Sequence, residues 1–368
     1  MATQSICAFL ADLYRGTLPR FFETEIPRET AATCADCAML AGPDRAREAG
    51  LCFSPESKCC TYYPNLPNYS VGALLCERSR ARAEGRRRLR EAIRKRVGIT
   101  PHGLERPRKY AAVLKNSKRQ AFGRCTSLIC PLYDRDRGAC TIHPAGCAVC
   151  DTWFCKYVSG EDGRLFWKLV QDYIERTERV LVQYALLDMG WAPGQIMRRD
   201  APAGLTPEDV DDAPPGPQDY ARLWGAWAGR EEAFYKQTYR AVAGISRRDF
   251  ARIAGISLKV IEEEVKGACR AMLATAPPKR LKRNPRLEVD RLRDGGYMLV
   301  GYSPLDPWAV SDRIYQILDF FDGRDSNAVV CWRIRKQLGA SPTNELLLAL
   351  YRFRILVNAD EEPAREGP

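Results

Sequence analysis

Apolar residues recur with helical spacing over much of the second half of the chain. Residues 161–191 predict one long helix, because their apolar positions follow the 3.6-residue period. Residues 218–275 predict further helices, with large aromatic side chains on the buried faces. Residues 192–217, between these two regions, are rich in proline, glycine and aspartate, and this composition indicates a surface linker.

The pattern changes after a short basic joint that contains prolines. Strand-like runs on either side of Gly295 and Gly296 predict a hairpin. Three helical segments follow, and residues 354–360 have the composition of a last strand. We therefore expect residues 284–360 to form a small winged-helix-like unit.

These patterns together predict a mainly α fold with a small α+β part. The expected units are a cysteine-cluster domain with a basic helix and the long helix (1–191), the linker (192–217), the helical region (218–275) and the C-terminal unit (284–360).

The chain shows no sign of membrane insertion or export. No apolar run approaches the roughly 20 residues that span a bilayer. The N-terminal residues lack the basic start, apolar core and small-residue cleavage site of a signal peptide. We therefore expect a cytoplasmic protein, with no membrane partner, in which thiols stay reduced.

The cysteines are distributed very unevenly. Of 15 cysteines, only Cys269 and Cys331 lie beyond residue 155. A disulfide framework would need an oxidising compartment, so metal binding is the favoured interpretation. Histidine is almost absent, and a thiolate-rich set of more than four ligands favours an iron–sulfur cluster, of the 4Fe–4S type, over zinc.

The cysteine spacing indicates which thiols bind the metal. A CxxC pair lets two thiolates from one tight loop reach the same metal centre. The expected ligands are Cys34, Cys37, Cys59, Cys60, Cys130, Cys140, Cys150 and Cys155. The roles of the other cysteines of this region and of one histidine stay open, namely Cys52, Cys76, Cys125, Cys147 and His143.

The net charge of +11 suggests an acidic partner. Much of the excess lies between Arg78 and Arg96, where the apolar spacing predicts a solvated helix with a narrow buried stripe. Residues 246–265 resemble a helix-turn-helix, but three consecutive glutamates in its second helix would face the DNA. Nucleic acid is therefore a less favoured partner than a peptide or protein substrate.

The segments CADC, KCC and CPLYDRDRGACTIHPAGCAVCDTWFCKYV resemble the CxxCxxCC (YkgJ-like) family of zinc- or iron-chelating proteins, over about residues 34–190. The resemblance implies metal chelation. Two departures are the 21 residues between CxxC and CysCys, and Ala145-Gly146 where Arg-Pro is usual. Flagellin lysine N-methylases look like members of the same wider group, which would imply methylation with S-adenosylmethionine and an iron–sulfur cluster. No glycine-rich nucleotide loop supports this independently.

The C-terminal unit resembles a PqqD-like domain, a peptide-recognition element of peptide-modification systems. The matching stretch is SDRIYQILDFFDG, residues 311–323, followed by two helices and a strand. The resemblance implies that a peptide adds as a strand to a sheet edge, here in the hairpin around Leu287–Val300. A winged helix used only for packing or dimerisation is the alternative.

The function predicted from these features is a metal-cluster protein acting in peptide or protein modification, whose C-terminal unit recruits the polypeptide. Two alternatives stay open: a metal- or redox-sensing DNA-binding regulator, and a zinc-stabilised scaffold without catalytic activity. The pattern identifies no general base, nucleophile or cofactor-binding residue, and it leaves the oligomeric state open. Asp151, Lys156 and Tyr157 merely adjoin the expected ligands in the sequence.

Overall fold

The computed structural model describes residues 2–40, 52–117, 121–144, 147–197, 205–293 and 295–361. The fold is mainly α-helical with small antiparallel sheets, as the periodicity predicts. The helices are α2 (Asn68–Cys76), α3 (Ala83–Lys95), α4 (Arg108–Asn116), α6 (Ala148–Thr152), α7 (Gly160–Asp188), α8 (Pro193–Met197), α9 (Pro207–Val210), α10 (Pro217–Trp224), α11 (Glu231–Ala243), α12 (Arg247–Ala254), α13 (Ile256–Met272), α14 (Asp312–Leu318), α15 (Asn327–Leu338) and α16 (Asn344–Arg352).

The strands are short and lie in several separate sheets. They are β1 (Thr3–Ser5), β2 (Glu25–Pro27), β3 (Leu66–Pro67), β4 (Ile99–Thr100), β5 (Gly103–Leu104), β6 (Tyr133–Asp134), β7 (Ala139–Cys140), β8 (Leu281–Arg283), β9 (Glu288–Arg291), β10 (Tyr297–Val300), β11 (Trp308–Val310) and β12 (Leu356–Asn358).

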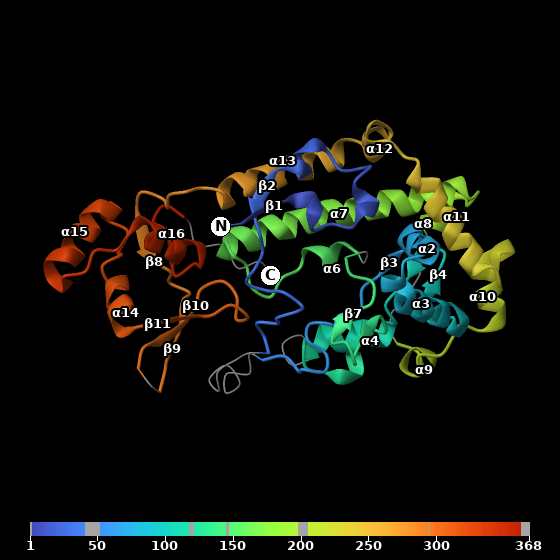
Figure 1. Ribbon diagram of the computed structural model, residues 1–368, viewed down its shortest axis with the longest axis horizontal. Coiled ribbons are helices and arrows are strands. Elements are labelled where there is room, and N and C mark those ends of the chain that lie inside the picture. Colours follow the sequence, from blue (N-terminus) through green and yellow to red (C-terminus); the bar gives the residue numbers. More distant parts are fainter. Residues whose placement is uncertain are drawn as a thin grey trace.

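The long helix α7 is the axis of the larger part of the molecule (Figure 1). Its apolar stripe is buried, with Phe166, Trp167 and Ile174 fully enclosed. Helix α13 packs along one side of α7, and α6 and α11 also contact it. The prediction of one helix over 161–191 is thus confirmed to within a few residues at each end.

Helices α2 and α11 approach each other unusually closely. A Cβ added at Gly72 of α2 would lie 1.9 Å from the carbonyl oxygen of Tyr235 of α11. Around this crossing, Trp224 packs edge-on against Phe234 and Tyr235, with ring centroids 5.3 and 5.7 Å apart. Glycine at position 72 therefore allows the two helix backbones to meet.

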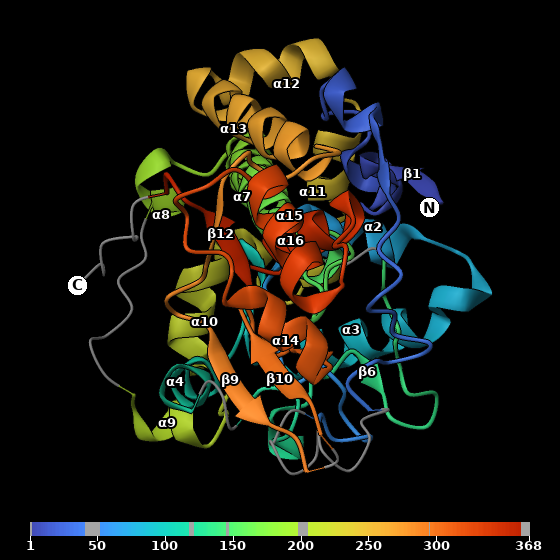
Figure 2. The same cartoon turned by 90° about the vertical axis from the view of Figure 1, so that its left-hand side faces the viewer.

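The C-terminal unit has its own hydrophobic core, built around Leu281, Leu299 and Leu318. Its three-stranded sheet has the order β11–β10–β9, and β12 pairs with β8. Helices α14, α15 and α16 pack with these strands (Figure 2). The predicted hairpin is confirmed as β9 and β10, with Gly295 and Gly296 at φ of 92° and 82°. Strands β8 and β11 were not predicted.

The region predicted as a linker contains short helices. Helices α8 and α9 lie within residues 192–217, and the chain enters α10 at Pro217. None of the helices in the described part of the chain is long and apolar enough to cross a membrane.

Candidate metal centre

The first two cysteine motifs form tight turns next to each other. In the CxxC loop, the backbone N–H of Leu40 donates to the carbonyl of Cys37 over 2.9 Å. In the second turn, Lys58 adopts a φ of 49°, and Cys60 then donates its N–H to the carbonyl of Ser57 over 2.9 Å. This left-handed residue turns the backbone directly before Cys59 and Cys60.

The later cysteines reach the same region through a hairpin. Strands β6 and β7 pair Tyr133 with Cys140. The backbone N–H of Cys130, just before the hairpin, donates to the carbonyl of Cys60 over 2.8 Å. This hydrogen bond joins the two halves of the cysteine pattern directly.

Lys58 binds two separate parts of the cysteine region together. Its ammonium group donates to the carbonyl of Cys34 over 2.8 Å and to the carbonyl of Gly138 over 2.7 Å. Arg88 of the basic helix α3 supports the hairpin from another side, since it donates to the carbonyls of Pro131 and Tyr133, each over 2.9 Å. Both side chains act on backbone carbonyls, so no sequence motif marks them.

The first thiol group consists of Cys34, Cys37, Cys59 and Cys155. The Cys34 thiol lies near enough to Cys59 to influence its ionisation, and Cys37, Cys59 and Cys155 share one apolar cluster with Met39, Phe53 and Leu305. Leu305 belongs to the loop between β10 and β11, so the C-terminal unit covers part of this group.

The second thiol group consists of Cys130, Cys140, Cys147 and Cys150. These four residues lie in the main hydrophobic core or pack against it, and Cys147, Cys130 and Cys140 all lie near enough to Cys150 to influence its ionisation. Cys60 directly follows Cys59 of the first group, and its carbonyl oxygen accepts the backbone N–H of Cys130 of the second group.

Burial opposes the ionisation of a thiol in each of the two groups. Burial raises the pKa of Cys130 to about 12 and the pKa of Cys155 to about 12. The neighbouring Cys147 thiol and burial together raise the pKa of Cys150. No group of three or more Cys, His, Asp or Glu side chains within the described ranges already has a metal-binding arrangement. A bound metal would have to displace protons and draw the sulfur atoms together.

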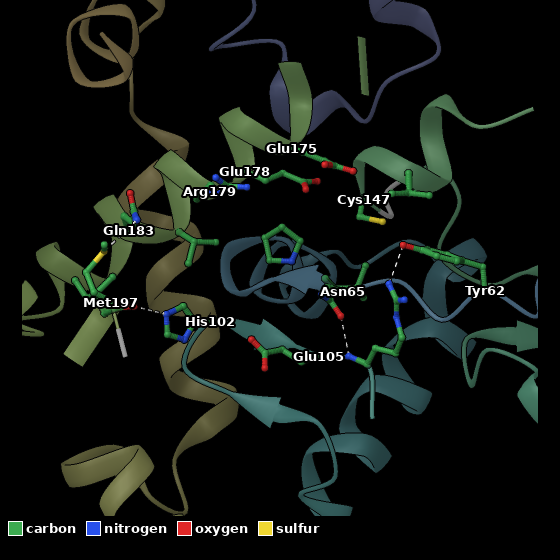
Figure 3. A pocket seen from close by; sticks show the side chains of 16 residues that line it. Tyr62, Asn65, His102, Glu105, Cys147, Glu175, Glu178, Arg179, Gln183 and Met197 are labelled. Atoms are coloured by element: carbon green, nitrogen blue, oxygen red, sulfur yellow. Dashed lines mark hydrogen bonds between the residues drawn. The ribbon is translucent and has the colours of Figure 1, made fainter. Parts of the chain in front are cut away.

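A cavity of about 580 Å³ opens beside the second thiol group. Figure 3 shows Cys147 on its wall, near Tyr62, and the side chains of Glu175, Glu178 and Arg179 along α7. The cavity is therefore large enough for a small molecule or a side chain, and it reaches a thiol of the group.

Glu178 connects this cavity to the helix that carries the thiols. Its Oε1 accepts the hydroxyl of Tyr14 over 2.5 Å and the backbone N–H of Ala148 over 2.8 Å. Ala148 is the first residue of α6, whose N-cap is Cys147. Burial raises the pKa of Glu178 to about 7, so this carboxyl group can hold or release a proton near neutral pH.

The structure brings the eight predicted cysteines into one region and adds Cys147, which the sequence left open. The sulfur of Cys125 lies 3.0 Å from the Ser127 hydroxyl, and Cys125 packs against the main hydrophobic core. Of the residues adjoining the ligands, Asp151 is buried and accepts the N–H of Ala11 over 3.3 Å, and Lys156 lies 3.6 Å from Asp306. No sequence pattern marked Lys58, Tyr14 or Glu178 as a site residue.

The helix-turn-helix-like segment is formed by α12, Gly255 and α13. Two of the three glutamates, Glu262 and Glu263, pair with Lys266 within α13. Ile256, at the start of α13, is 75% exposed.

Comparison of this chain with protein-family models, with curated proteins and with solved structures finds no match. Its function is therefore inferred from its own residues.

Proposed function

We propose that this protein holds a metal cluster, of the iron–sulfur type, and acts in peptide or protein modification, with the C-terminal unit recruiting the polypeptide. The observation that carries the proposal is the meeting of the 34–60 and 130–155 cysteines, joined at Cys60 and Cys130 over 2.8 Å.

The donor set suits such a group. Cys34, Cys37, Cys59 and Cys155 would hold one centre, and Cys130, Cys140, Cys147 and Cys150 a second. All fifteen cysteines lie in the described residues and are free thiols, so none is consumed by a disulfide. Soft thiolates without histidine favour iron–sulfur over zinc. A bound cluster would supply electron transfer or Lewis-acid chemistry beside the Cys147 cavity.

Metal and sulfide analysis of anaerobically purified protein tests this proposal. We expect iron and acid-labile sulfide in comparable amounts, with a brown colour. Stoichiometric zinc without sulfide, from iron-replete cells, would favour the zinc-stabilised scaffold instead. A chain that folds fully without any metal would contradict both forms of the proposal.

The recruitment part of the proposal is supported by the sheet of the C-terminal unit. Strand β10 is paired on both sides, so the edges of the described sheet are β9 and β11. An exposed edge is a template for an added strand. The β10–β11 loop also contacts the first thiol group through Leu305, which would bring a bound peptide near the metal centre.

Peptides encoded near this gene provide the test, titrated calorimetrically into the full chain. Strand addition predicts that N-methylation of alternate residues of a bound peptide abolishes binding, whereas methylation of the intervening residues does not. Equal effects of both methylation patterns, or no peptide binding, would contradict recruitment by strand addition.

A further inference from the structure

Three arginine side chains surround an open pocket on a part of the molecule that the thiol groups do not touch. The pocket measures about 570 Å³ and is lined by Arg94, Arg96 and Arg230 together with the first residues of α11. Its lining residues come from the end of α3 and the start of α11, two helices that Figure 1 draws toward the right-hand end of the molecule. No cysteine lines it.

These guanidinium groups have unused hydrogen-bond donors. Within the described residues, none of the three has a hydrogen bond or ion pair through its side chain. Arg96 lies over the ring of Tyr220 at 4.4 Å, and Arg230 lies over the ring of Trp227 at 4.8 Å. Stacking holds the guanidinium planes of Arg96 and Arg230 in place and leaves their N–H edges available.

Two carboxylates that line the pocket, Glu231 and Glu232, have hydrogen-bond or ion-pair partners other than the three arginines. Glu231 accepts the Tyr220 hydroxyl over 2.7 Å and the N–H of Gly229 over 2.6 Å. Glu232 forms ion pairs with Arg90 and Lys236, at 3.1 and 2.6 Å. Neither carboxylate has a hydrogen bond or ion pair with Arg94, Arg96 or Arg230 within the described residues, and the carboxylate whose charge interacts with Arg94 is Glu91. The N-terminal dipole of α11 adds to the positive charge of the pocket.

We propose that this pocket binds the phosphate group of a small molecule, such as a nucleotide. Guanidinium forks match the oxygen geometry of phosphate, and three of them around one pocket suit a dianion. The ion pairs of the other arginines of α3 favour a small ligand over a nucleic acid strand. Arg87 and Arg88 pair with Glu84, and Arg90 pairs with Glu232, so no continuous unpaired basic stripe follows the helix.

Calorimetry of the full chain with inorganic phosphate, AMP and adenosine tests the site. We expect phosphate and AMP to bind and adenosine not to bind. Arg94→Gln or Arg230→Gln should weaken AMP binding by at least about tenfold, since each removes charge-assisted hydrogen bonds. Arg230→Lys should recover only part of the affinity, because an ammonium group lacks the fork.

Arg248→Gln and Arg335→Gln are matched controls, because both side chains are exposed, lie outside the pocket and change the net charge equally. They should leave AMP binding unchanged, and all variants should keep the parent melting temperature. If the pocket and control variants lose the same amount of AMP affinity, net charge alone explains the effect, and the proposal is overturned. Absence of phosphate binding would also overturn it, as would binding only to duplex DNA.

Discussion

The backbone N–H of Cys130 donates a hydrogen bond to the carbonyl oxygen of Cys60 over 2.8 Å. This backbone contact holds the 130–155 cysteine segment against the turn at Cys59 and Cys60, and it needs no metal ligand. The backbone, rather than the thiols, therefore brings the two halves of the pattern together. The neighbouring thiols and burial raise the pKa of Cys34 in the first group and of Cys150 in the second.

The grouping of the thiols predicts which cysteines matter for metal content. Cys147→Ser should lower bound metal as much as Cys150→Ser, because the two thiols are neighbours in the second group. Cys125→Ser is the control, since that sulfur contacts Ser127 instead. Metal analysis of the purified variants checks this, and a loss confined to Cys125→Ser would show that the grouping is wrong.

Lys58 should stabilise the cysteine region through its two backbone contacts. Lys58→Met removes hydrogen bonds to the carbonyls of Cys34 and Gly138 and should lower the free energy of unfolding by about 1–3 kcal/mol. Urea unfolding measures this change. Lys115→Met, at an exposed position of α4, should be close to neutral. Equal effects of the two substitutions would contradict the role of Lys58.

Glu178 should give the stability of the protein a specific pH dependence. Its pKa is raised from 4.5 to about 7 by burial, so the carboxyl group binds its proton more tightly in the folded state. Its favourable contribution is full below about pH 4.5 and is lost as the pH rises through about 7. The total change is at most about 3 kcal/mol.

Denaturant unfolding of the parent and of Glu178→Gln, at several pH values and in the same metal state, isolates this contribution. The parent should lose stability relative to Glu178→Gln between about pH 4.5 and 7. Glu105→Gln, elsewhere on the lining of the cavity, is the control. A difference between parent and Glu178→Gln that is independent of pH would refute the prediction.

The close approach of α2 and α11 makes Gly72 intolerant of a side chain. Gly72→Ala would place a Cβ 1.9 Å from the Tyr235 carbonyl oxygen and should cost about 3 kcal/mol or more, because backbone must move. At Gly244, just after α11, a Cβ meets nothing within 4 Å and φ is −93°. Gly244→Ala should therefore change the melting temperature little, and a similar loss in both variants would contradict this packing argument.

Periodicity and turn chemistry were enough to predict the large elements. The 3.6-residue period located α7, and the glycine pair at 295 and 296 located the β9–β10 hairpin, because both signals are local. Strands β8 and β11 were not predicted, because each is only three residues long and too short to show an alternation of apolar and polar residues. They exist because β12 and β10 supply their hydrogen-bond partners.

For the candidate metal centre, residue type and spacing alone were enough to select the cysteines expected to bind metal, since both are local properties of the sequence. Only the tertiary structure decided how the thiols divide into two groups, that Cys147 belongs to one of them, and that Glu178 and Lys58 support them. These relationships join segments far apart in the sequence through backbone carbonyls and N–H groups, which every residue carries and no motif can mark.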